Sequence, residues 1–517
     1  MTSFRVSHSL FEFIEIMDNL IVKNKNHSVL HVECDYGIAN ELSEFFSFFV
    51  PGYKFMPAYK NRVWDGKIRL FDVRTNELPV GLVPFLEEFA KPRNYPITVE
   101  HDNYYGRPDA TNAIDPDKIM EFIKNEQIMS RGSPIEVRDY QFDAICEGLH
   151  KKRSVLISPT GSGKSLIIYI LIKYYLGLLN DSRGSKKVLI IVPTTSLVQQ
   201  MYNDFEDYGM LVENGCHKIY SGKDKETDKG IVISTWQSIY KLPPKWFEKF
   251  GCVIGDECHG FKSKSLTTIM NKCKEAEYRF GTTGTLDGTQ THELVLQGLF
   301  GKIYNVTTTK KLQDNDTLSK LNINVLLLTY PESIRKEFGR KEYHDELDFI
   351  VQHEGRNKLI KNLALDLKGN TLVLFQYVEK HGKPLFELIR DGAAEGRKIF
   401  YVSGQVEASD REVIRQIVET QTNAVIVASL GTFSTGINIS NLHNIIFASP
   451  SKSQVRVLQS IGRSLRKSDD GSDATLYDLA DDLHWKSRRN FTLTHSEERI
   501  KIYAKEQFNY KVYEVKL

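Results

Sequence analysis

The sequence predicts an α/β protein with two parallel-sheet lobes, a small N-terminal accessory domain and a short C-terminal helix-strand extension. Its length of 517 residues exceeds what one hydrophobic core usually covers. Short runs rich in β-branched and aliphatic residues alternate with amphipathic stretches, which is typical of a parallel sheet with helices on both faces. This alternation stops in a polar passage at 307–320 and then resumes, which indicates a second lobe.

The expected strands are short apolar runs. In the first lobe they lie at 154–158, 187–193, 230–235, 251–257 and 278–283. In the second lobe they lie at 323–331, 371–376, 398–404, 424–429, 444–450 and 474–480. Between two of these runs, helical periodicity at 410–420 with Ser409 as the expected N-cap predicts a covering helix.

The first hundred residues differ in character, with many aromatic residues, scattered prolines and no phosphate-binding loop. Prolines and glycine after residue 95 are typical of a linker. We therefore expect a small domain at 1–100, a linker at 101–130, the lobes at 131–310 and 311–485, and the extension at 486–517. In the extension we expect a helix capped by Ser496 and then an edge strand that contains Val512 and Val515.

Composition narrows the class of protein. The formal net charge of +2 is nearly neutral, so any surface that binds nucleic acid must be local. Six cysteines include no C-x-x-C pair and no histidine at zinc-ligand spacing, which indicates neither a disulfide framework nor a structural metal. The longest apolar run, 166–179, is interrupted by Lys173 and reads as a buried helix. With no secretory signal at the N-terminus, these features predict a cytoplasmic protein without a membrane partner.

A phosphate-binding loop is predicted at S-P-T-G-S-G-K-S, residues 158–165. Backbone N–H groups of such a turn converge on a phosphate at the start of the following helix, so Thr160, Gly161, Ser162 and Gly163 should surround the ATP phosphates. Lys164 would lie between the β- and γ-phosphates, and the Ser165 hydroxyl would ligate Mg²⁺. The strict pattern begins with glycine, where this chain has Ser158. An ordinary glycine-rich turn is the alternative, but strand, glycines, lysine and serine all occur in the expected order.

The second half of the ATP site is predicted at D-E-C-H, residues 256–259. Asp256 follows an apolar strand, at the strand end where open α/β sheets bind ligands, and would hold the Mg²⁺. Glu257 could orient and deprotonate the attacking water. An Asp-Glu pair after a strand is weak evidence alone, because it is often a helix cap, but together with the upstream loop it predicts an ATP-hydrolysing enzyme.

A third motif, Q-S-I-G-R-S-L-R at 459–466, completes a resemblance to superfamily 2 helicases and translocases of the D-E-x-H type that extends from about Arg138 to Lys467. The resemblance implies RecA-like lobes and a catalytic set that also includes His259 and Gln459. Arg463 and Arg466 lie three residues apart, on one helix face, and would act as arginine fingers supplied by the second lobe.

The resemblance also implies nucleotide contacts outside the loop. In V-R-D-Y-Q, Arg138 and Gln141 would contact the nucleotide, with Gln141 at the adenine edge, although a polar helix start capped by Asp139 explains the residues equally well. In S-T-G-I-N, Gly436 and Asn438 would contact the nucleotide. The T-T-G-T segment at 282–285 would couple the state of ATP to the position of the lobes.

Nucleic-acid contacts follow from the same resemblance. They are expected at Thr194, Thr195, Trp236 and Gln237 in the first lobe and at Gln376 and Thr435 in the second. Contacts of this kind are made to phosphates and do not read bases, so sequence-independent binding of single-stranded DNA is expected.

A basic and aromatic segment precedes the lobes at 51–71. It contains Lys54, Lys60, Arg62 and Lys67, with Tyr59 and Trp64 between them and Tyr53 directly before them. Such a composition is typical of a groove that stacks bases and binds phosphate, and we call this segment the candidate DNA-binding patch. It is equally typical of a small domain whose aromatic residues form its core.

Within superfamily 2, W-D-G-K-I-R-L at 64–70 makes the chain most similar to the recombination helicases of T-even bacteriophages. This implies an ATP-driven DNA helicase that unwinds and branch-migrates forks, Holliday junctions, D-loops and R-loops in replication, recombination and repair, with RNA as a partner within R-loops. An RNA-directed helicase, a double-stranded-DNA translocase without strand separation and a P-loop protein without a nucleic-acid substrate remain alternatives. The oligomeric state is open, with a monomer favoured.

Overall fold

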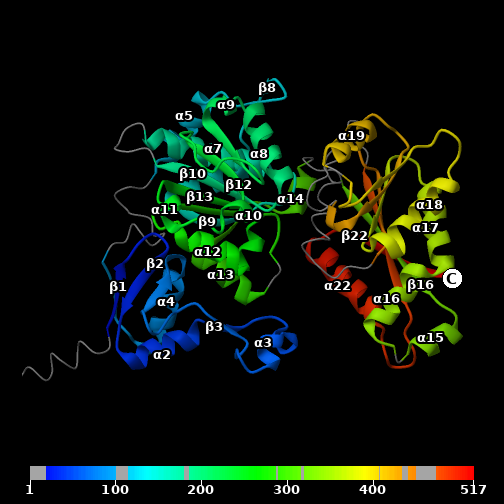
Figure 1. The fold of residues 1–517 in the computed structure, drawn as a ribbon, viewed down its shortest axis with the longest axis horizontal. Coiled ribbons are helices and arrows are strands. Elements are labelled where there is room, and N and C mark those ends of the chain that lie inside the picture. Colours follow the sequence, from blue (N-terminus) through cyan, green and yellow to red (C-terminus); the bar gives the residue numbers. More distant parts are fainter. Residues whose placement is uncertain are drawn as a thin grey trace, which may run out of the picture. The chain divides into compact units, whose positions relative to one another are not determined.

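A computed structural model describes residues 19–100, 114–179, 186–286, 289–315, 320–339, 341–406, 408–432, 441–449 and 473–517 (Figure 1). The chain divides into two compact units, residues 1–158 with 163–306 and residues 159–162 with 307–517. The first unit holds the N-terminal domain and lobe 1, and the second holds lobe 2.

Lobe 1 contains a seven-stranded parallel sheet in the order β11-β12-β10-β13-β14-β9-β15. Its strands are β9 (Arg153–Ile157), β10 (Lys187–Val192), β11 (Cys216–Ile219), β12 (Ile231–Thr235), β13 (Phe250–Asp256), β14 (Tyr278–Thr283) and β15 (Ile303–Asn305). Alternate residues of β10 enter different cores, with Ile190 on one face and Ile191 on the other. The five strands expected for this lobe are therefore confirmed, and the two edge strands β11 and β15 are additional.

Helices cover both faces of this sheet. They include α6 (Asp139–Lys151), α7 (Lys164–Leu179), α8 (Thr195–Asp207), α9 (Val212–Gly215), α10 (Trp236–Ile239), α11 (Pro244–Phe247), α12 (Lys264–Lys272) and α13 (Gln290–Phe300). The run expected to be a buried helix is α7, in which residues 166–172 are all buried. Across the described parts of the chain, no helix has the length and apolar character to cross a membrane.

Part of the expected linker is helical. Helix α5 (Pro116–Asn125) begins with proline at its first position, where the missing N–H costs nothing, and Asp115 caps it. Ile119 and Ile123, four residues apart, are buried in the core of lobe 1. We therefore propose that the linker ends before α5.

The N-terminal domain has a four-stranded sheet in the order β5-β2-β1-β6. Its elements are β1 (Leu20–Asn24), β2 (Val29–Glu33), α2 (Tyr36–Phe45), β3 (Ser47–Phe49), α3 (Pro57–Lys60), β4 (Lys67–Arg69), β5 (Glu77–Pro79), the 3₁₀ turn η2 (Val80–Leu82), α4 (Val83–Ala90) and β6 (Ile97–Val99). Strands β3 and β4 pair with each other, and the chain between them makes an excursion that carries α3 away from the main sheet (Figure 1).

Lobe 2 repeats the architecture of lobe 1, with a parallel sheet in the order β18-β19-β17-β20-β21-β16-β22. Its strands are β16 (Leu321–Thr329), β17 (Thr371–Phe375), β18 (Ile399–Val402), β19 (Val425–Ser429), β20 (Asn444–Phe447), β21 (Ala474–Asp482) and β22 (Asn509–Lys516). The six strands expected for this lobe are confirmed. The expected C-terminal edge strand is β22, which pairs in parallel with β16 and completes the sheet.

The helices of this unit are α14 (Thr309–Asp314), α15 (Glu332–Phe338), α16 (Tyr343–Gln352), α17 (Glu354–Asp366), α18 (Lys383–Asp391), α19 (Ala408–Glu419) and α22 (Phe491–Lys505). Two buried ion pairs join them to β21. Arg356 of α17 lies 2.7 Å from Asp481, and Arg499 of α22 lies 2.8 Å from Asp478.

Two expected helix caps are wrong. Helix α19 begins at Ala408, so Ser409 is inside the helix. Helix α22 begins at Phe491, so Ser496 is also an interior residue. The carboxylate of Glu346 on α16 accepts the N–H groups of Phe491 and Thr492 at 3.0 and 2.7 Å, so the start of α22 is stabilised by a distant helix.

Candidate ATP site and nucleic-acid interface

The predicted phosphate loop connects β9 to α7. Gly161 and Gly163 have φ values of +83° and +82°, a left-handed conformation that favours glycine. Within the turn, the Ser162 hydroxyl donates to the Pro159 carbonyl at 2.6 Å. The turn leads directly into Lys164, the first residue of α7, so the helix N-terminus and its free N–H groups follow the loop as an anion site requires.

The two predicted carboxylates lie where β13 ends. Asp256 is the last residue of the strand and is buried, and the Thr282 hydroxyl donates to its Oδ1 at 2.8 Å. Glu257 has a φ of +52°, in the left-handed region that non-glycine residues rarely adopt. This conformation turns the chain sharply after β13, and such strained residues concentrate at functional sites.

Lys164 joins the loop to both carboxylates. Its Nζ lies 3.1 Å from Asp256 Oδ1 and 2.8 Å from Glu257 Oε1. Burial alone would lower the pKa of Lys164, but attraction to the two carboxylates outweighs burial and raises it. Burial would likewise raise the pKa of Glu257, but Lys164 and a hydrogen bond with His259 lower it well below its usual range. Lys164 is therefore a fixed cation and Glu257 a fixed anion at neutral pH.

The threonines of the T-T-G-T segment contact the same carboxylates. While Thr282 binds Asp256, the Thr283 hydroxyl lies 3.5 Å from Glu257 Oε2 and 2.9 Å from His259 Nδ1. His259 Nδ1 in turn lies 3.4 Å from Glu257 Oε2. Thr282 and Thr283, at the carboxyl end of β14, thus contact Asp256, Glu257 and His259, the catalytic side chains expected in the D-E-C-H motif.

The side chains at this site suit ATP and Mg²⁺. Ser165 offers a hydroxyl oxygen and Asp256 a carboxylate oxygen, the hard ligands that Mg²⁺ prefers. Lys164 and the amino end of α7 supply positive charge for phosphates. Because Lys164 is held by two carboxylates, a bound triphosphate would have to draw its ammonium group away from them.

Arg138 and Gln141 lie at the start of α6. The N-cap is Arg138, so the alternative of an Asp139 cap is wrong. Gln141 is buried, and its Oε1 accepts the Arg138 N–H at 2.9 Å in a capping box. A Cβ at Gly163 would come within 2.2 Å of Gln141 Nε2, so this amide packs directly against the phosphate loop.

The residues of lobe 1 that are predicted to contact nucleic acid lie together. Strands β10 and β12 are neighbours whose ends align, with Val192 opposite Thr235. Thr194 caps α8, Thr195 is exposed beside it, and Gln237 Nε2 donates to the Pro193 carbonyl at 3.3 Å. Trp236 begins α10 and packs edge-to-face on Tyr240. The two segments thus form one continuous polar edge at the carboxyl ends of the strands.

In lobe 2, Gln376 follows β17 and is exposed. Its backbone N–H donates to the Ser449 hydroxyl at 3.2 Å, and that hydroxyl lies 2.9 Å from His381 Nδ1. No sequence motif marks Ser449 or His381, so sequence analysis did not identify these two residues. The remaining predicted residues lie outside the described part of the chain: Thr435, Gly436, Asn438, Gln459, Arg463 and Arg466.

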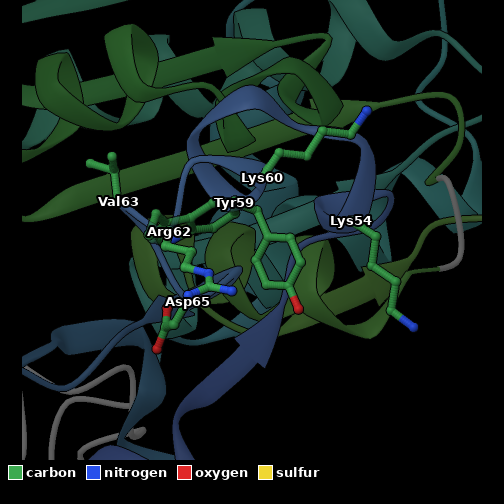
Figure 2. Close-up of a pocket in the computed structure, with 7 residues that line it drawn as sticks. Lys54, Tyr59, Lys60, Arg62, Val63 and Asp65 are labelled. Carbon is green, nitrogen blue, oxygen red and sulfur yellow. The ribbon is translucent and has the colours of Figure 1, made fainter.

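The candidate DNA-binding patch lies on the excursion between β3 and β4. An open pocket of about 500 Å³ is lined by Lys54, Tyr59, Lys60, Arg62, Val63, Trp64 and Asp65. In Figure 2 the ends of Lys54 and Lys60 and the ring of Tyr59 extend away from the ribbon. Sequence reasoning did not single out Phe55 and Val63, which are 81% and 82% exposed on the same excursion.

Tyr53, Phe55, Tyr59 and Trp64 of this patch are not part of the core of the domain. Within the segment, Phe71 is buried in the N-terminal cluster, together with residues outside the segment such as Leu30 and Phe46. Tyr53 stacks on Phe49 with ring centroids 4.6 Å apart, and Trp64 Nε1 donates to the Lys67 carbonyl at 2.8 Å. The aromatic rings therefore shape the excursion and leave its cations at the surface.

Three family models match the chain. They are the N-terminal domain of DNA helicase UvsW at residues 19–100, the res subunit of type III restriction enzymes at 134–288, and the helicase conserved C-terminal domain at 355–468. A curated relative, DNA 3'-5' translocase XPB2 of Sulfurisphaera tokodaii, is 25% identical over 65% of this chain and 80% of its own length.

Similarity to one phage protein extends over almost the whole chain. The ATP-dependent DNA helicase uvsW of Enterobacteria phage T4 is 36% identical over 96% of this chain and 100% of its own length. The crystal structure of T4 UvsW matches with a TM-score of 0.50 and 34% identity over 96% of this chain and 99% of that chain. The chain therefore belongs to the UvsW family of superfamily 2 helicases.

Proposed function

We propose that this protein is an ATP-dependent DNA helicase that unwinds and branch-migrates forks, Holliday junctions, D-loops and R-loops during phage replication, recombination and repair. The observation that carries the proposal is the meeting of three side chains: Lys164 Nζ lies within 3.1 Å of both Asp256 and Glu257. These residues lie in lobe 1, where four of the expected DNA contacts also lie. The T4 relative is named an ATP-dependent DNA helicase. The protein would act in the cytoplasm of the host cell, and its oligomeric state is open, with a monomer favoured.

ATP binding would begin at the phosphate loop. Backbone N–H groups at Thr160, Gly161, Ser162 and Gly163 and the amino end of α7 would bind phosphate oxygens. Lys164 would leave its two carboxylates for the β- and γ-phosphates. Ser165 and Asp256 would hold Mg²⁺, which supplies charge neutralisation to the triphosphate when bound. Arg138 and Gln141 would flank the base.

Hydrolysis would follow once Glu257 is free of Lys164. Its carboxylate would orient the attacking water and accept a proton, with His259 and Thr283 holding it in place. Gln459, Arg463 and Arg466 would stabilise the charge that develops on the γ-phosphoryl group, and Gly436 and Asn438 would contact the nucleotide from the same lobe. Because these groups come from lobe 2, hydrolysis would require the two lobes to close.

Single-stranded DNA would lie across the carboxyl ends of the strands. Thr194, Thr195, Trp236 and Gln237 in lobe 1, with Gln376 and Thr435 in lobe 2, would contact its backbone through hydroxyls, amides and N–H groups. Such contacts do not depend on base identity. Duplex arms of a branched substrate would be bound by the candidate DNA-binding patch, where Lys54, Lys60, Arg62, Trp64 and Lys67 gather.

The DNA requirement can be tested by comparing ATPase stimulation by single-stranded DNA, duplex DNA, forked DNA and R-loops with stimulation by RNA of the same length, and by measuring strand separation on the same DNA substrates. We expect forked DNA to stimulate most. Stimulation by RNA alone would indicate an RNA-directed helicase, and stimulation by duplex DNA without strand separation would indicate a translocase. No stimulation by any polynucleotide would exclude the helicase function.

Replacing Lys60, Arg62 and Lys67 together with alanine should weaken forked-DNA binding. Each phosphate contact contributes about 0.9 to the slope of log affinity against log salt, so the slope should fall by about 2 to 3. Fluorescence anisotropy at several salt concentrations measures both quantities. A control in which Lys23, Arg74 and Lys91 of the same domain become alanine removes equal charge and should keep the slope. An unchanged slope in the first variant would show that the patch is structural.

Arg466→Ala should lower turnover far more than nucleotide affinity, because an arginine finger acts mainly in the transition state. We expect kcat of ATP hydrolysis to fall by about 10³-fold. Steady-state kinetics give kcat, and titration with a non-hydrolysable ATP analogue gives affinity. An equal loss of both would indicate that Arg466 packs within lobe 2 and does not contact the reacting phosphate.

A further inference from the structure

The N-terminal domain docks against lobe 1 at the amino ends of β9 and β14. Arg153, the first residue of β9, and Arg279, the second residue of β14, lie opposite each other in the register, and both are buried. Arg279 Nη2 donates to the Ser28 hydroxyl at 2.6 Å, and Arg153 Nη2 donates to the His27 carbonyl at 3.0 Å. The His27 N–H in turn donates to the Lys274 carbonyl at 3.1 Å. The β1–β2 turn is therefore bonded to the end of the sheet opposite the ATP site.

A second contact lies between η2 and α13. A Cβ at Gly81 would come within 1.8 Å of the Gln297 carbonyl oxygen, so the two backbones touch. A Cβ at Gly298 would lie 3.1 Å from Pro79, and Leu294 of α13 is buried in the core of the N-terminal domain. One helix of lobe 1 is thus shared between the core of the N-terminal domain and the sheet.

These two contacts are on either side of the T-T-G-T segment in the chain. Arg279 precedes Thr282 by three residues of continuous strand, and α13 follows the segment. The face of α13 that packs on the sheet also lies next to the site, because the Phe300 ring contacts two glycines there. A Cβ added at Gly281 would lie 3.0 Å from this ring, and a Cβ added at Gly255 would lie 2.8 Å from it. Those glycines directly precede Thr282 and Asp256. Interiors packed this closely transmit small displacements.

We propose that the N-terminal domain is a positioning element of the ATPase. By holding β14 at Arg279 and α13 at Gly298, it fixes Thr282 and Thr283 against Asp256, Glu257 and His259. Hydrolysis of ATP, and not only DNA binding, then depends on the docked domain. This inference rests on the proposed ATP hydrolysis at Lys164, and it assigns Ser28 and Gly81 roles that no motif of the sequence marks.

The test uses two variants of the full chain, Ser28→Ala and Gly81→Ala. The first removes a hydroxyl that accepts from Arg279, and the second pushes η2 away from the α13 backbone. With a saturating single-stranded oligonucleotide, kcat of ATP hydrolysis should fall about threefold in the first and about tenfold in the second. The KM for ATP and the Kd for the oligonucleotide should stay within about twofold, because neither residue lies at the ATP or DNA site. Tyr36→Ala, an exposed change in the same domain, should leave all three values unchanged.

A double-mutant cycle separates positioning from general destabilisation. Thr282→Val keeps the shape of the side chain and removes the hydroxyl that binds Asp256. If Ser28 acts through Thr282, then Ser28→Ala should cost little further kcat in the Thr282→Val background. Fully additive losses, or an unchanged kcat in Ser28→Ala and Gly81→Ala with a normal melting temperature, would overturn the inference. Retained hydrolysis in Lys164→Ala would instead overturn the proposed ATP site, so the two failures are distinguishable.

Discussion

Lys164→Ala is expected to abolish ATP hydrolysis, with kcat reduced by at least about 100-fold, while single-stranded and forked DNA remain bound. The ammonium group lies 3.1 Å from Asp256 and 2.8 Å from Glu257, so it is the one cation at the centre of the described site. The expected DNA contacts follow β10 and β12, and β13 and β14 separate these strands from β9 and the phosphate loop. Steady-state ATPase assays and fluorescence anisotropy with labelled DNA measure the two effects.

The loss must be distinguished from unfolding, because Lys164→Ala leaves two carboxylates close together without their cation. Lys173→Ala is a matched control on the same helix. Lys173 also forms an ion pair, 2.9 Å from Glu126, but lies far along α7 from the loop. This control should keep its kcat. Hydrolysis that persists in Lys164→Ala, at a normal melting temperature, would place the active site elsewhere.

The central strands could be predicted because buried parallel strands are continuous apolar runs. Residues 188–192 of β10 and 371–375 of β17 are entirely buried, and every position is apolar or β-branched. The two edge strands of lobe 1 gave no such signal. Strand β11 has the sequence C-H-K-I, with polar residues in its middle, and β15 has only three residues. Short edge strands resemble loops in composition, so periodicity does not find them.

Contacts between distant residues were beyond sequence reasoning. Ser496 has the residue type and the following glutamates of a helix start, but α22 begins five residues earlier because Glu346 binds its first N–H groups. Charged residues are expected at surfaces, yet Arg356 and Asp481 form a fully buried pair. The docking of Arg153 and Arg279 on the β1–β2 turn belongs to the same class of contact.

The meeting of the candidate ATP-site side chains was more predictable than the fold around them, since short motifs fix the residue types that phosphate chemistry needs. Lys164, Asp256 and Glu257 meet as the sequence predicts. The left-handed backbone of Glu257 was not predictable, because glutamate has no preference for it. The bond from Gln141 to the Arg138 N–H was not predicted, because the alternatives were a nucleotide contact and a helix start capped by Asp139.

Glu257→Gln is expected to lower kcat by about 10²–10⁴-fold without raising the KM for ATP. Glutamine keeps the shape of the side chain and one acceptor oxygen, but it carries no charge and cannot accept the proton of the attacking water. In the described structure Lys164 and His259 outweigh burial and keep the pKa of Glu257 low, so the carboxylate is ionised. Departure of Lys164 to the phosphates would raise this pKa and make Glu257 a stronger base. A variant that binds ATP and does not hydrolyse it should accumulate the ATP-bound state, which rapid filtration with labelled ATP measures directly.

The control for this variant is Glu126→Gln, which neutralises the carboxylate paired with Lys173 and should hydrolyse ATP at the wild-type rate. The two ion pairs have similar lengths, 2.8 Å for Lys164 with Glu257 and 2.9 Å for Lys173 with Glu126, so both substitutions neutralise a carboxylate that is paired with a lysine of α7. A difference in kcat between the variants therefore reports chemistry at the phosphate. If Glu257→Gln raised the KM in proportion to its loss of kcat, or turned over ATP as fast as Glu126→Gln, Glu257 would be a partner of Lys164 and not the catalytic base.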